Sequence, residues 1–351
     1  GVEILDGEII ELLNMFPPLI RTFPQDNHPT TFEILTAMAM HHFKKKGVSY
    51  AVLETGMGGR FDSTNFCDPD ISIITSVSYD HMDKLGERIE QIAFEKAGII
   101  KPERPVVVGY QVYDVIDIFR KKAREMRSPF HVVSELATYE IESLTPQGTW
   151  VSATIGKRRL TDLFISLPGK HQVENVLVAL VSLYIIDMLP GNGKIRVALR
   201  EVFLPARLEY FELKRRYLLD SAHNGDSARV LAESVRNAYR RNRLFTVVGI
   251  VKGKDVREIL AQLAPISDEL IVTEPLTHKD GAPHRGMKTI HVAGTKGKGS
   301  VCQILSTLLR VQGISTGLFT SPHIERVNER ISVNGVEILD GEIIELLNMF
   351  P

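Results

Sequence analysis

The sequence is poor in cysteine and tryptophan and carries almost no net charge. Its two cysteines, Cys67 and Cys302, are too few for a disulfide scaffold and stand in no metal-ligand pairing, so we expect a reducing cytoplasm. Lysine and arginine number 42 against 43 acidic residues, which leaves a formal net charge of −1. This balance gives no electrostatic reason to expect nucleic acid or an anionic membrane as a partner. No apolar run approaches the roughly 20 residues that span a bilayer, and the acidic first residues do not resemble a signal peptide.

The rest of the composition is that of an ordinary globular protein. Hydrophobic residues make up 44% of the chain and charged residues 24%. A chain of 351 residues is longer than one hydrophobic core usually serves, so we expect two domains.

The two ends of the chain carry the same segment. Residues 1–17 and residues 335–351 both read GVEILDGEIIELLNMFP. Repeat proteins show imperfect copies that are adjacent in sequence at periods of about 20–50 residues, which this duplicate does not resemble. The simplest interpretation is a permuted chain, in which residues 287–351 belong before residue 18 and Met287 is an original start or a designed join.

Undoing the permutation gives a regular alternation of strands and helices. A strand at 288–294 leads through a glycine-rich loop to a helix over 300–313, and a capping box of Thr30 and Glu33 starts a helix that ends at Gly47. A second α/β unit begins near Arg207, and antiparallel strands are expected within 135–166. The remaining predicted elements are strands at 315–321, 50–54, 71–76, 105–110, 217–220, 244–250 and 269–274 and helices over 340–350 and 226–240. This rhythm predicts a parallel α/β sheet.

The loop HVAGTKGKGSV, at 291–301, has the context of a phosphate-binding loop. Its glycines let backbone amides approach phosphates, the following helix N-terminus adds positive potential, and Lys298 can reach the β and γ oxygens. The strict G-x-x-x-x-G-K-[ST] pattern fails, because Val292 replaces its first glycine and Gly299 its last residue. The alternative is a surface turn, which the coincidence of strand, loop and helix disfavours.

The variant loop GTKGKGS resembles that of the Mur ligase superfamily, specifically its folylpolyglutamate synthase / dihydrofolate synthase branch. Further blocks match in the family's order: SPHIERVNERI (321–331), LETGMGGRFDSTN (53–65), DHMDKLGERIEQIAFEKAGII (80–100), GKHQVENVLVAL (169–180) and LLDSAHN (218–224). The resemblance implies an α/β fold: a P-loop parallel-sheet ATPase domain of the Mur ligase central type, plus a smaller, truncated Rossmann-like domain of the C-terminal type.

The resemblance also implies an activity, which is ATP-dependent addition of L-glutamate to a (tetrahydro)folate or to dihydropteroate. The substrate carboxylate would be phosphorylated, and the glutamate amine would then attack the acyl phosphate. Three alternatives stay open. They are another Mur-type ligase acting on a cell-wall precursor, an ATP-binding chain without turnover, and a generic P-loop kinase, in which Glu54, His81 and Lys96 would have no purpose.

By the same resemblance, Lys298, Glu54, His81 and Lys96 are the expected catalytic residues, and Ser321, Glu54 and His81 the ligands of two Mg²⁺ ions. Hard Mg²⁺ prefers oxygen ligands, so a histidine is an odd choice on chemistry alone. Lys96 resembles the family lysine that is carbamylated, and a carbamate suits nearby Mg²⁺ where an ammonium would repel it. Otherwise Lys96 is a solvated helix lysine.

The resemblance assigns nucleotide contacts to both domains. Arg207 suits a phosphate and Asp220 a ribose hydroxyl, with His223 supporting Asp220; the alternative for the Arg207 and Asp220 pair is an interdomain salt bridge. Gly225 replaces the family's usual proline after Asn224, which we expect to loosen that turn. The remaining nucleotide contacts are Lys296, Gly297, Lys298, Gly299, Ser300 and Asn175.

Two further stretches match positions that line a dihydropteroate pocket in the bifunctional members. Glu33 is also explained by its capping box and Phe32 by a core position. The matched residues are Thr30, Thr31, Phe32, Glu33, Phe61, Asp62 and Ser63.

The expected domain organisation follows the permutation. Residues 287–351 and 1–204 form the ATP-binding central domain, residues 205–280 the C-terminal-type domain, and residues 281–286 the join. Family members carry further C-terminal strands, for which this chain has only GAPHRG before Met287. We expect a cytoplasmic monomer whose partners are small molecules: ATP, L-glutamate, and folate or dihydropteroate.

Overall fold

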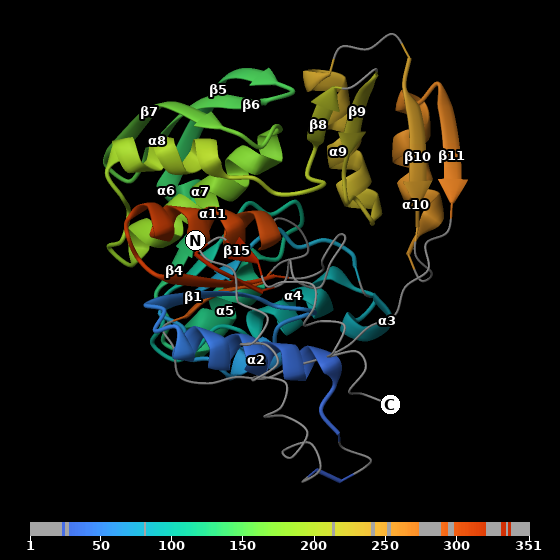
Figure 1. Ribbon diagram of the computed structural model, residues 1–351. Helices are drawn as coiled ribbons and strands as arrows, with labels where there is room; N and C mark the ends of the chain where they lie inside the picture. The colour runs from blue at the N-terminus through green and yellow to red at the C-terminus, as the bar shows by residue number, and fades with distance from the viewer. Residues whose placement is uncertain are drawn as a thin grey trace.

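A computed structural model of the chain describes residues 23–24, 28–80, 82–212, 215–239, 243–250, 254–273, 289–293, 298–320, 331–334 and 336–337. The helix expected over 340–350 lies outside these residues. The described part forms a large unit around one sheet and a smaller unit beside it (Figure 1). No helix in these ranges is both long and apolar enough to cross a bilayer.

The central sheet has eight strands in the order β15-β14-β13-β1-β12-β2-β3-β4. The six strands from β13 to β4 run parallel, and β14 and β15 add antiparallel pairs at one edge. The strands are β1 (Tyr50–Glu54), β2 (Ile71–Ile74), β3 (Val106–Val108), β4 (Phe130–Val132), β12 (Thr289–Ala293), β13 (Thr316–Phe319), β14 (Ile331–Val333) and β15 (Val336–Glu337).

Strand β12, from the last quarter of the chain, lies inside this sheet. Ile290 pairs with Val52 of β1 on one side, and Val292 pairs with Ile73 of β2 on the other. Both neighbours come from the first quarter of the chain. The sheet is therefore incomplete without the C-terminal segment, as the permuted order predicts.

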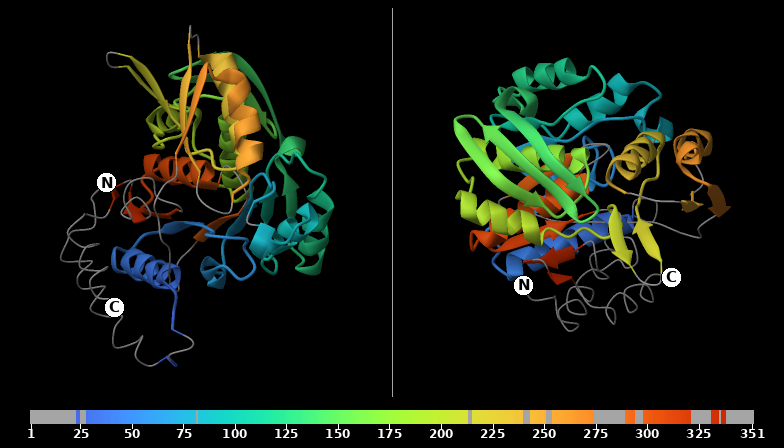
Figure 2. Two further views of the ribbon diagram at one scale, coloured as in Figure 1. Left: turned by 90° about the vertical axis from the view of Figure 1, so that its right-hand side faces the viewer. Right: turned by 90° about the horizontal axis from the view of Figure 1, so that it is seen from above.

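Helices cover both faces of the sheet, because both faces are apolar. In β3, Val107 points to one hydrophobic core while Val106 and Val108 point to another. The first core is closed by α7 (Lys170–Ile185), α8 (Asn192–Glu201) and α11 (Lys298–Val311), and the second by α4 (Ile89–Ala97) and α5 (Ile116–Glu125). α2 (Thr31–Lys45) lies on the face opposite α11 (Figures 1 and 2). The result is a three-layer α/β/α unit.

Helix α2 begins and ends where the sequence predicts. The Thr30 hydroxyl accepts from the Glu33 backbone N–H at 3.4 Å, and the Glu33 carboxylate accepts from the Thr30 N–H at 2.8 Å. Gly47, just beyond the last turn, has φ +62°, a conformation that glycine adopts at no steric cost. The capping box is confirmed.

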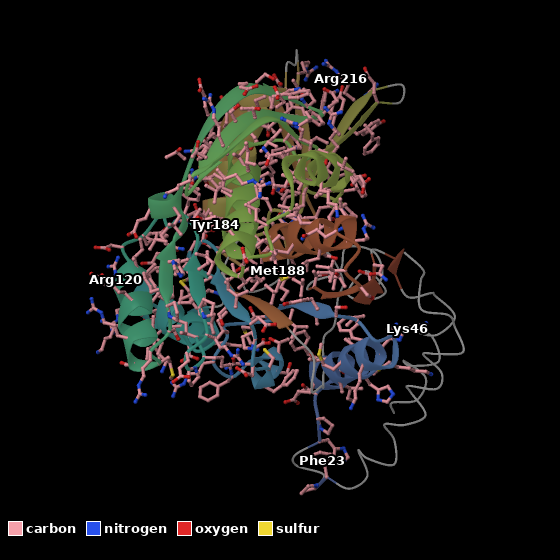
Figure 3. The ribbon with its side chains drawn as sticks, turned by 90° about the vertical axis from the view of Figure 1, so that its left-hand side faces the viewer. Phe23, Lys46, Arg120, Tyr184, Met188 and Arg216 are labelled. Atoms are coloured by element: carbon pink, nitrogen blue, oxygen red, sulfur yellow. The ribbon has the colours of Figure 1, made fainter. Side chains whose placement is uncertain are left out.

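A separate antiparallel sheet lies over α7 and α8. Its strands are β5 (Ala137–Thr145), β6 (Gly148–Ile155) and β7 (Arg158–Ile165), which confirms the antiparallel strands predicted within 135–166. Short elements connect the larger ones: η2 (Ser63–Phe66), α3 (Met82–Leu85) and α6 (Val133–Leu136). Met188, just beyond α7, lies next to the end of α11, where the Gln312 amide donates to its carbonyl at 3.0 Å (Figure 3).

The smaller unit is a second, short α/β arrangement. Strands β10 and β11 pair in parallel, and Ala228, Ile259 and Leu263 form the centre of the core beneath them. The predicted fold class, a parallel-sheet unit plus a smaller α/β unit, is confirmed. The elements are β8 (Glu209–Glu212), β9 (Arg216–Leu219), α9 (Gly225–Ala238), β10 (Phe245–Gly249), α10 (Val256–Leu263), η3 (Ala264–Ile266) and β11 (Glu269–Thr273).

The packing of α2, near the start of the chain, against β13, near its end, can be tested by substitution. A methyl group at Gly317 would lie 2.5 Å from the ring of Phe43, which is fully buried in α2. We predict that Gly317→Ala destabilises the protein by about 1–3 kcal/mol through overpacking. Gly193→Ala is the matched control, because nothing lies within 4 Å of its added methyl. Equal unfolding midpoints in urea for the two variants would contradict this packing.

Candidate active site

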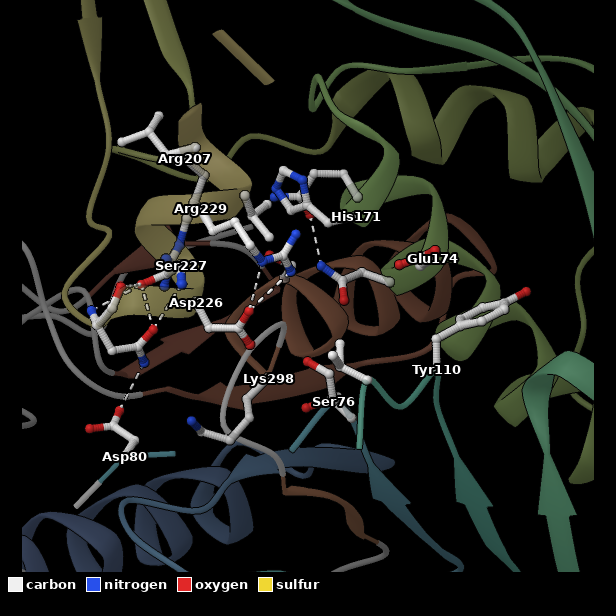
Figure 4. Close-up of a pocket in the computed structure, with 18 of the residues that line it drawn as sticks. Ser76, Asp80, Tyr110, His171, Glu174, Arg207, Asp226, Ser227, Arg229 and Lys298 are labelled. Atoms are coloured by element: carbon white, nitrogen blue, oxygen red, sulfur yellow. Dashed lines mark hydrogen bonds and ion pairs between the residues drawn. The ribbon is translucent and has the colours of Figure 1, made fainter. Parts of the chain in front are cut away.

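A cavity of about 490 Å³ lies where the carboxyl ends of the parallel strands face the smaller unit. In open α/β sheets this edge is where ligands bind. Figure 4 shows Lys298 and Ser76 on the side of the large sheet and Arg207, Asp226 and Arg229 on the side of α9. Both units therefore contribute to its wall.

The cavity gathers many of the residues singled out in the sequence. They come from five separate chain segments, and the cavity lies between the N-terminus of α11 and the first residues of the smaller unit. The predicted residues that line it are Glu54, Lys96, Asn175, Arg207, Asp220, His223, Lys298 and Ser300.

Glu54 and Lys298 form the charged centre of the cavity floor. Glu54 is the last residue of β1 and is 2% exposed, and its Oε1 lies 3.9 Å from the Nζ of Lys298, the first residue of α11. A buried carboxylate is costly unless a cation compensates it. Behind this pair, burial raises the pKa of the Cys302 thiol, which keeps that thiol neutral and inert.

Lys96 points a buried amine toward the same space. It lies in the last turn of α4, is 4% exposed and lines the cavity. Burial, and secondarily the positive charge of Lys298, lower the pKa of the Lys96 amine to about 7. A solvated surface lysine is therefore excluded, and an uncharged, nucleophilic amine is available near neutral pH.

The oxygen groups around Glu54 suit a hard cation. The hydroxyl of Thr55 follows Glu54 at the cavity wall, is buried and has no hydrogen-bond partner among the described residues. The carboxylate of Glu54 is an anionic oxygen donor of the kind Mg²⁺ prefers. Within the described ranges no three His, Cys, Asp or Glu side chains cluster as metal ligands. His81 and Ser321, predicted as the other ligands, lie outside those ranges.

Asp80 joins the two units across the cavity. Its carboxylate lies 2.5 Å from the Lys254 amine, accepts from the Asn224 side-chain amide at 3.3 Å and lies 3.5 Å from Nε2 of His223. Asp80 belongs to the large unit, whereas the other three belong to the smaller one. The side chain of Asp80 is 9% exposed, so these contacts are sheltered from screening by salt.

His223 was predicted to support Asp220, and its ring is engaged elsewhere. Nδ1 lies 2.9 Å from the Ser221 carbonyl, and Nε2 faces Asp80. Its effect on Asp220 is a weak electrostatic lowering of the pKa. Gly225, expected to loosen the turn after Asn224, is the first residue of α9. Asn224 caps α9 there, and the Glu258 carboxyl packs so closely over Gly225 that a methyl group would overlap it.

Arg207 stands in a turn of unusual backbone geometry. Ala206 has φ +45° and Leu208 has φ +53°, both in the left-handed region that residues other than glycine avoid at a cost of about 1–2 kcal/mol each. Asp220 holds this turn, because its carboxylate accepts from the Leu208 N–H at 3.0 Å and from the Ala222 N–H at 2.9 Å. Burial raises the pKa of Asp220, and the Arg207 charge and these amides oppose the rise.

The opposite end of the cavity is built on the first turns of α7. The Asn175 side chain donates to Gln172 at 3.0 Å, and Glu174 pairs with Lys170 at 3.6 Å and accepts from the Tyr139 hydroxyl at 3.1 Å. The amine, amides and carboxylate at this end offer hydrogen bonds of both kinds to a ligand.

The residues expected to line a dihydropteroate pocket lie outside the cavity lining. Phe32 comes nearest, since its ring packs against Gly56 of the cavity wall. Asp62 caps η2 and accepts from the Met57 N–H at 2.8 Å, which ties the cavity wall to the turn carrying Phe61. Phe61 itself is 82% exposed. Thr30, Thr31 and Glu33 are exposed around the start of α2, and Ser63 begins η2.

The other predicted nucleotide contacts precede or begin α11 in the sequence. Lys296 and Gly297 lie outside the described residues. Gly299 and Ser300 are in the first turn of α11, and Ser300 is buried at 4% exposure. Sequence reasoning missed Asp80 and Lys254, although Asp80 directly precedes His81 in a matched block.

Comparison with known proteins identifies the protein family to which the chain belongs. Residues 9–183 match the family model of the Mur ligase middle domain, and residues 206–309 match that of the Mur ligase glutamate ligase domain. The second match runs across β12, which is a strand of the eight-stranded sheet, and α11, which packs against β1, β12 and β13. The chain belongs to the Mur ligase family.

Within that family, the chain is similar to dihydrofolate synthases and folylpolyglutamate synthases. The dihydrofolate synthase/folylpolyglutamate synthase of Bacillus subtilis is 32% identical over 279 residues, which are 76% of this chain and 64% of that protein. The folylpolyglutamate synthase of Thermotoga maritima superposes with a TM-score of 0.68 at 28% identity, covering 87% of this chain and 77% of that one. An FPGS–AMPPCP–folate complex superposes with a TM-score of 0.65 at 26% identity, covering 80% and 70%. The match thus spans less than two thirds of the Bacillus relative's length.

The buried amine of Lys96 predicts a distinct pH dependence of stability. Its pKa is about 7 in the folded protein against 10.5 in an exposed lysine, so the unfolded chain binds more protons between these values. The free energy of unfolding therefore rises with pH between about 7 and 10.5, because folding releases a proton in this range. The cost of burying the charged amine is greatest at and below pH 7.

We predict that Lys96→Met is more stable than the parent by a few kcal/mol near pH 7 and that this difference shrinks toward pH 10.5. The measurement is chemical denaturation of both proteins at several pH values in buffer purged of carbon dioxide. Lys194→Met, at an exposed lysine of α8, is the control and should give a flat difference. A flat difference for Lys96→Met as well would rule out the lowered pKa.

Proposed function

We propose that this chain is an ATP-dependent ligase that joins L-glutamate to a folate or to dihydropteroate through an acyl phosphate. The observation that carries the proposal is the single cavity in which a helix-N-terminal lysine, a buried strand-end carboxylate, a buried neutral amine and an arginine of the second unit meet. The similarity to dihydrofolate synthases and folylpolyglutamate synthases supports the choice of substrates.

ATP would occupy the cavity with its phosphates at the N-terminus of α11. Lys298 and Ser300 lie there, and the end of the helix adds positive potential. The guanidinium of Arg207 approaches from the smaller unit and would pair with phosphate oxygens. Asp220 and Asn175 complete the nucleotide contacts, together with Lys296, Gly297 and Gly299. The FPGS–AMPPCP–folate complex supports this use of the site.

Glu54 would hold Mg²⁺ together with His81 and Ser321, and the buried hydroxyl of Thr55, which has no hydrogen-bond partner in the described part of the chain, is a further oxygen beside it. Mg²⁺, when bound, neutralises charge on the phosphates and orients the transfer. We propose that the Lys96 amine forms a carbamate with carbon dioxide, which its pKa of about 7 permits at neutral pH. A carbamate resonance in ¹³C-bicarbonate NMR, absent from Lys96→Ala, tests this modification.

The reaction has two balanced steps. An oxygen of the substrate carboxylate attacks the γ-phosphorus, the bond to the β-phosphate oxygen breaks, and ADP leaves. The amine of L-glutamate then attacks the acyl carbon, the bond to phosphate breaks, and the new amide forms as the amine loses a proton. Lys298 would stabilise charge that develops on the transferred phosphoryl group, in a cavity sheltered from bulk water.

The folate or dihydropteroate would enter along the turn that follows the cavity wall. Phe61 is exposed there, and the Arg60 guanidinium lies 4.8 Å from its ring and 5.2 Å from that of Phe94. This cluster offers faces on which a flat heterocycle can stack. The predicted substrate residues Thr30, Thr31, Phe32, Glu33, Asp62 and Ser63 flank the same side.

The domain organisation belongs to the same proposal. Residues 287–351 and 1–204 would form the ATP-binding domain, residues 205–280 the second domain, and residues 281–286 the join. The protein would act in the cytoplasm as a monomer on small-molecule substrates.

The direct test is phosphate release from ATP in the presence of L-glutamate, reduced folate or dihydropteroate, and Mg²⁺. We expect release that requires both glutamate and the pteroyl substrate. Lys298→Ala should reduce turnover by two or more orders of magnitude while the protein stays folded. Lys194→Ala, at an exposed lysine of α8, is the control and should be unchanged. Release that ignores the pteroyl substrate and follows a cell-wall precursor would assign another Mur-type ligase, and nucleotide binding without release an inactive form.

The role of Glu54 predicts a change in metal dependence. Glu54→Gln keeps the shape of the side chain and removes its charge, so a higher Mg²⁺ concentration should be needed for half-maximal turnover. ATP affinity at low metal should change little. Titrating Mg²⁺ against turnover checks this expectation, and a titration curve that matches the parent's would remove Glu54 from the metal site.

A further inference from the structure

The two residues that flank Arg207 are held in place at every backbone polar group. The Glu209 carboxylate accepts from the Ala206 N–H at 2.9 Å, and the Asp220 carboxylate accepts from the Leu208 N–H at 3.0 Å. On the acceptor side, the Ser221 N–H donates to the Ala206 carbonyl at 2.9 Å, and the Tyr239 hydroxyl donates to the Leu208 carbonyl at 3.2 Å. Neither flanking residue has a free amide or carbonyl.

This bonding is notable because the flanking residues are in a conformation that they disfavour. Ala206 and Leu208 both have positive φ and are both buried, at 8% and 2% exposure. Such strain persists only where the surroundings over-determine the backbone, and it concentrates at functional sites. A relaxed turn would move the Cα of Arg207 and with it the guanidinium.

The restraints come from three different elements. Glu209 begins β8, Asp220 follows β9, and Tyr239 follows the last turn of α9. Asp220 is itself placed among the nucleotide contacts, but Glu209 and Tyr239 do not line the cavity in the described part of the chain. Their hydrogen bonds reach the cavity through the backbone around Arg207.

We propose that Glu209 and Tyr239 are positioning residues that hold the Arg207 guanidinium ready for the nucleotide phosphates. The proposal rests on the proposed function for the role of Arg207 in binding ATP. Because the backbone on both sides of Arg207 is already fixed, binding does not have to order this segment, so loss of the restraints raises the dissociation constant for nucleotide. Neither residue touches the ligand.

The test is the dissociation constant of a non-hydrolysable ATP analogue, AMPPCP, measured by calorimetry on the full chain with Mg²⁺. Tyr239→Phe removes one hydroxyl and keeps the ring, and Glu209→Ala removes the acceptor for the Ala206 amide. Each should raise the dissociation constant about five- to tenfold, the loss of about one hydrogen bond's net worth. Glu209→Gln keeps an acceptor oxygen and should stay within about twofold of the parent.

Matched controls come from the same hairpin. The Tyr210 ring lies 5.8 Å from that of Tyr239, and its hydroxyl donates to Glu212 at 3.3 Å without reaching the Arg207 turn. Tyr210→Phe and Glu212→Ala should leave the dissociation constant unchanged. Thermal unfolding of every variant shows that the fold is kept.

A double-mutant cycle separates positioning from general damage. In an Arg207→Ala background, Tyr239→Phe and Glu209→Ala should have no further effect on the dissociation constant, since the side chain they position is gone. Equal losses in both backgrounds, or no loss in the parent background, would overturn the proposal. A protein that shows the predicted coupling but forms no amide would overturn the ligase function and leave the positioning role intact.

Discussion

The constraint on which the structure depends is the place of β12 inside the central sheet. Its parallel pairing with β1 and β2 brings residues from opposite ends of the chain into neighbouring strands, with their carboxyl ends at one edge. Glu54 ends β1 and Lys298 begins the helix after β12, so this one pairing places the buried carboxylate and the lysine 3.9 Å apart. Without β12 the sheet would be divided between β1 and β2.

Electrostatics in the cavity follows from burial rather than from the protein's overall charge, which is near zero. The cost of burying a charge shows in the Lys96 amine, whose pKa falls to about 7. Within the lining, Lys298 and Arg207 suit a ligand with several negative charges, which a triphosphate would supply. The carboxylate of Asp80, in the large unit, contacts Lys254 and His223 of the smaller unit. These contacts hold the smaller unit against the cavity.

Local signals made the fold largely predictable from sequence. The Thr30 and Glu33 capping box, the glycine after α2 and the alternation of strands and helices each depend on neighbouring residues. The cavity residues were foreseeable from matched motifs, although their individual roles remain predictions. The Asp80–Lys254 pair was not, because 174 residues separate its partners and only the docking of two units joins them. Alanine and leucine disfavour the positive φ that Ala206 and Leu208 adopt beside Arg207, so no local sequence pattern predicts this turn.

The central claim is that the cavity activates a carboxylate by phosphorylation before the amide forms. The most direct measurement uses a pteroyl substrate with ¹⁸O in the reacting carboxylate, together with unlabelled ATP and L-glutamate. An acyl phosphate breaks at the bond between carbon and the bridging oxygen, so the account predicts one ¹⁸O in each inorganic phosphate released. Phosphate free of the label, formed at the same rate as the amide, would contradict it.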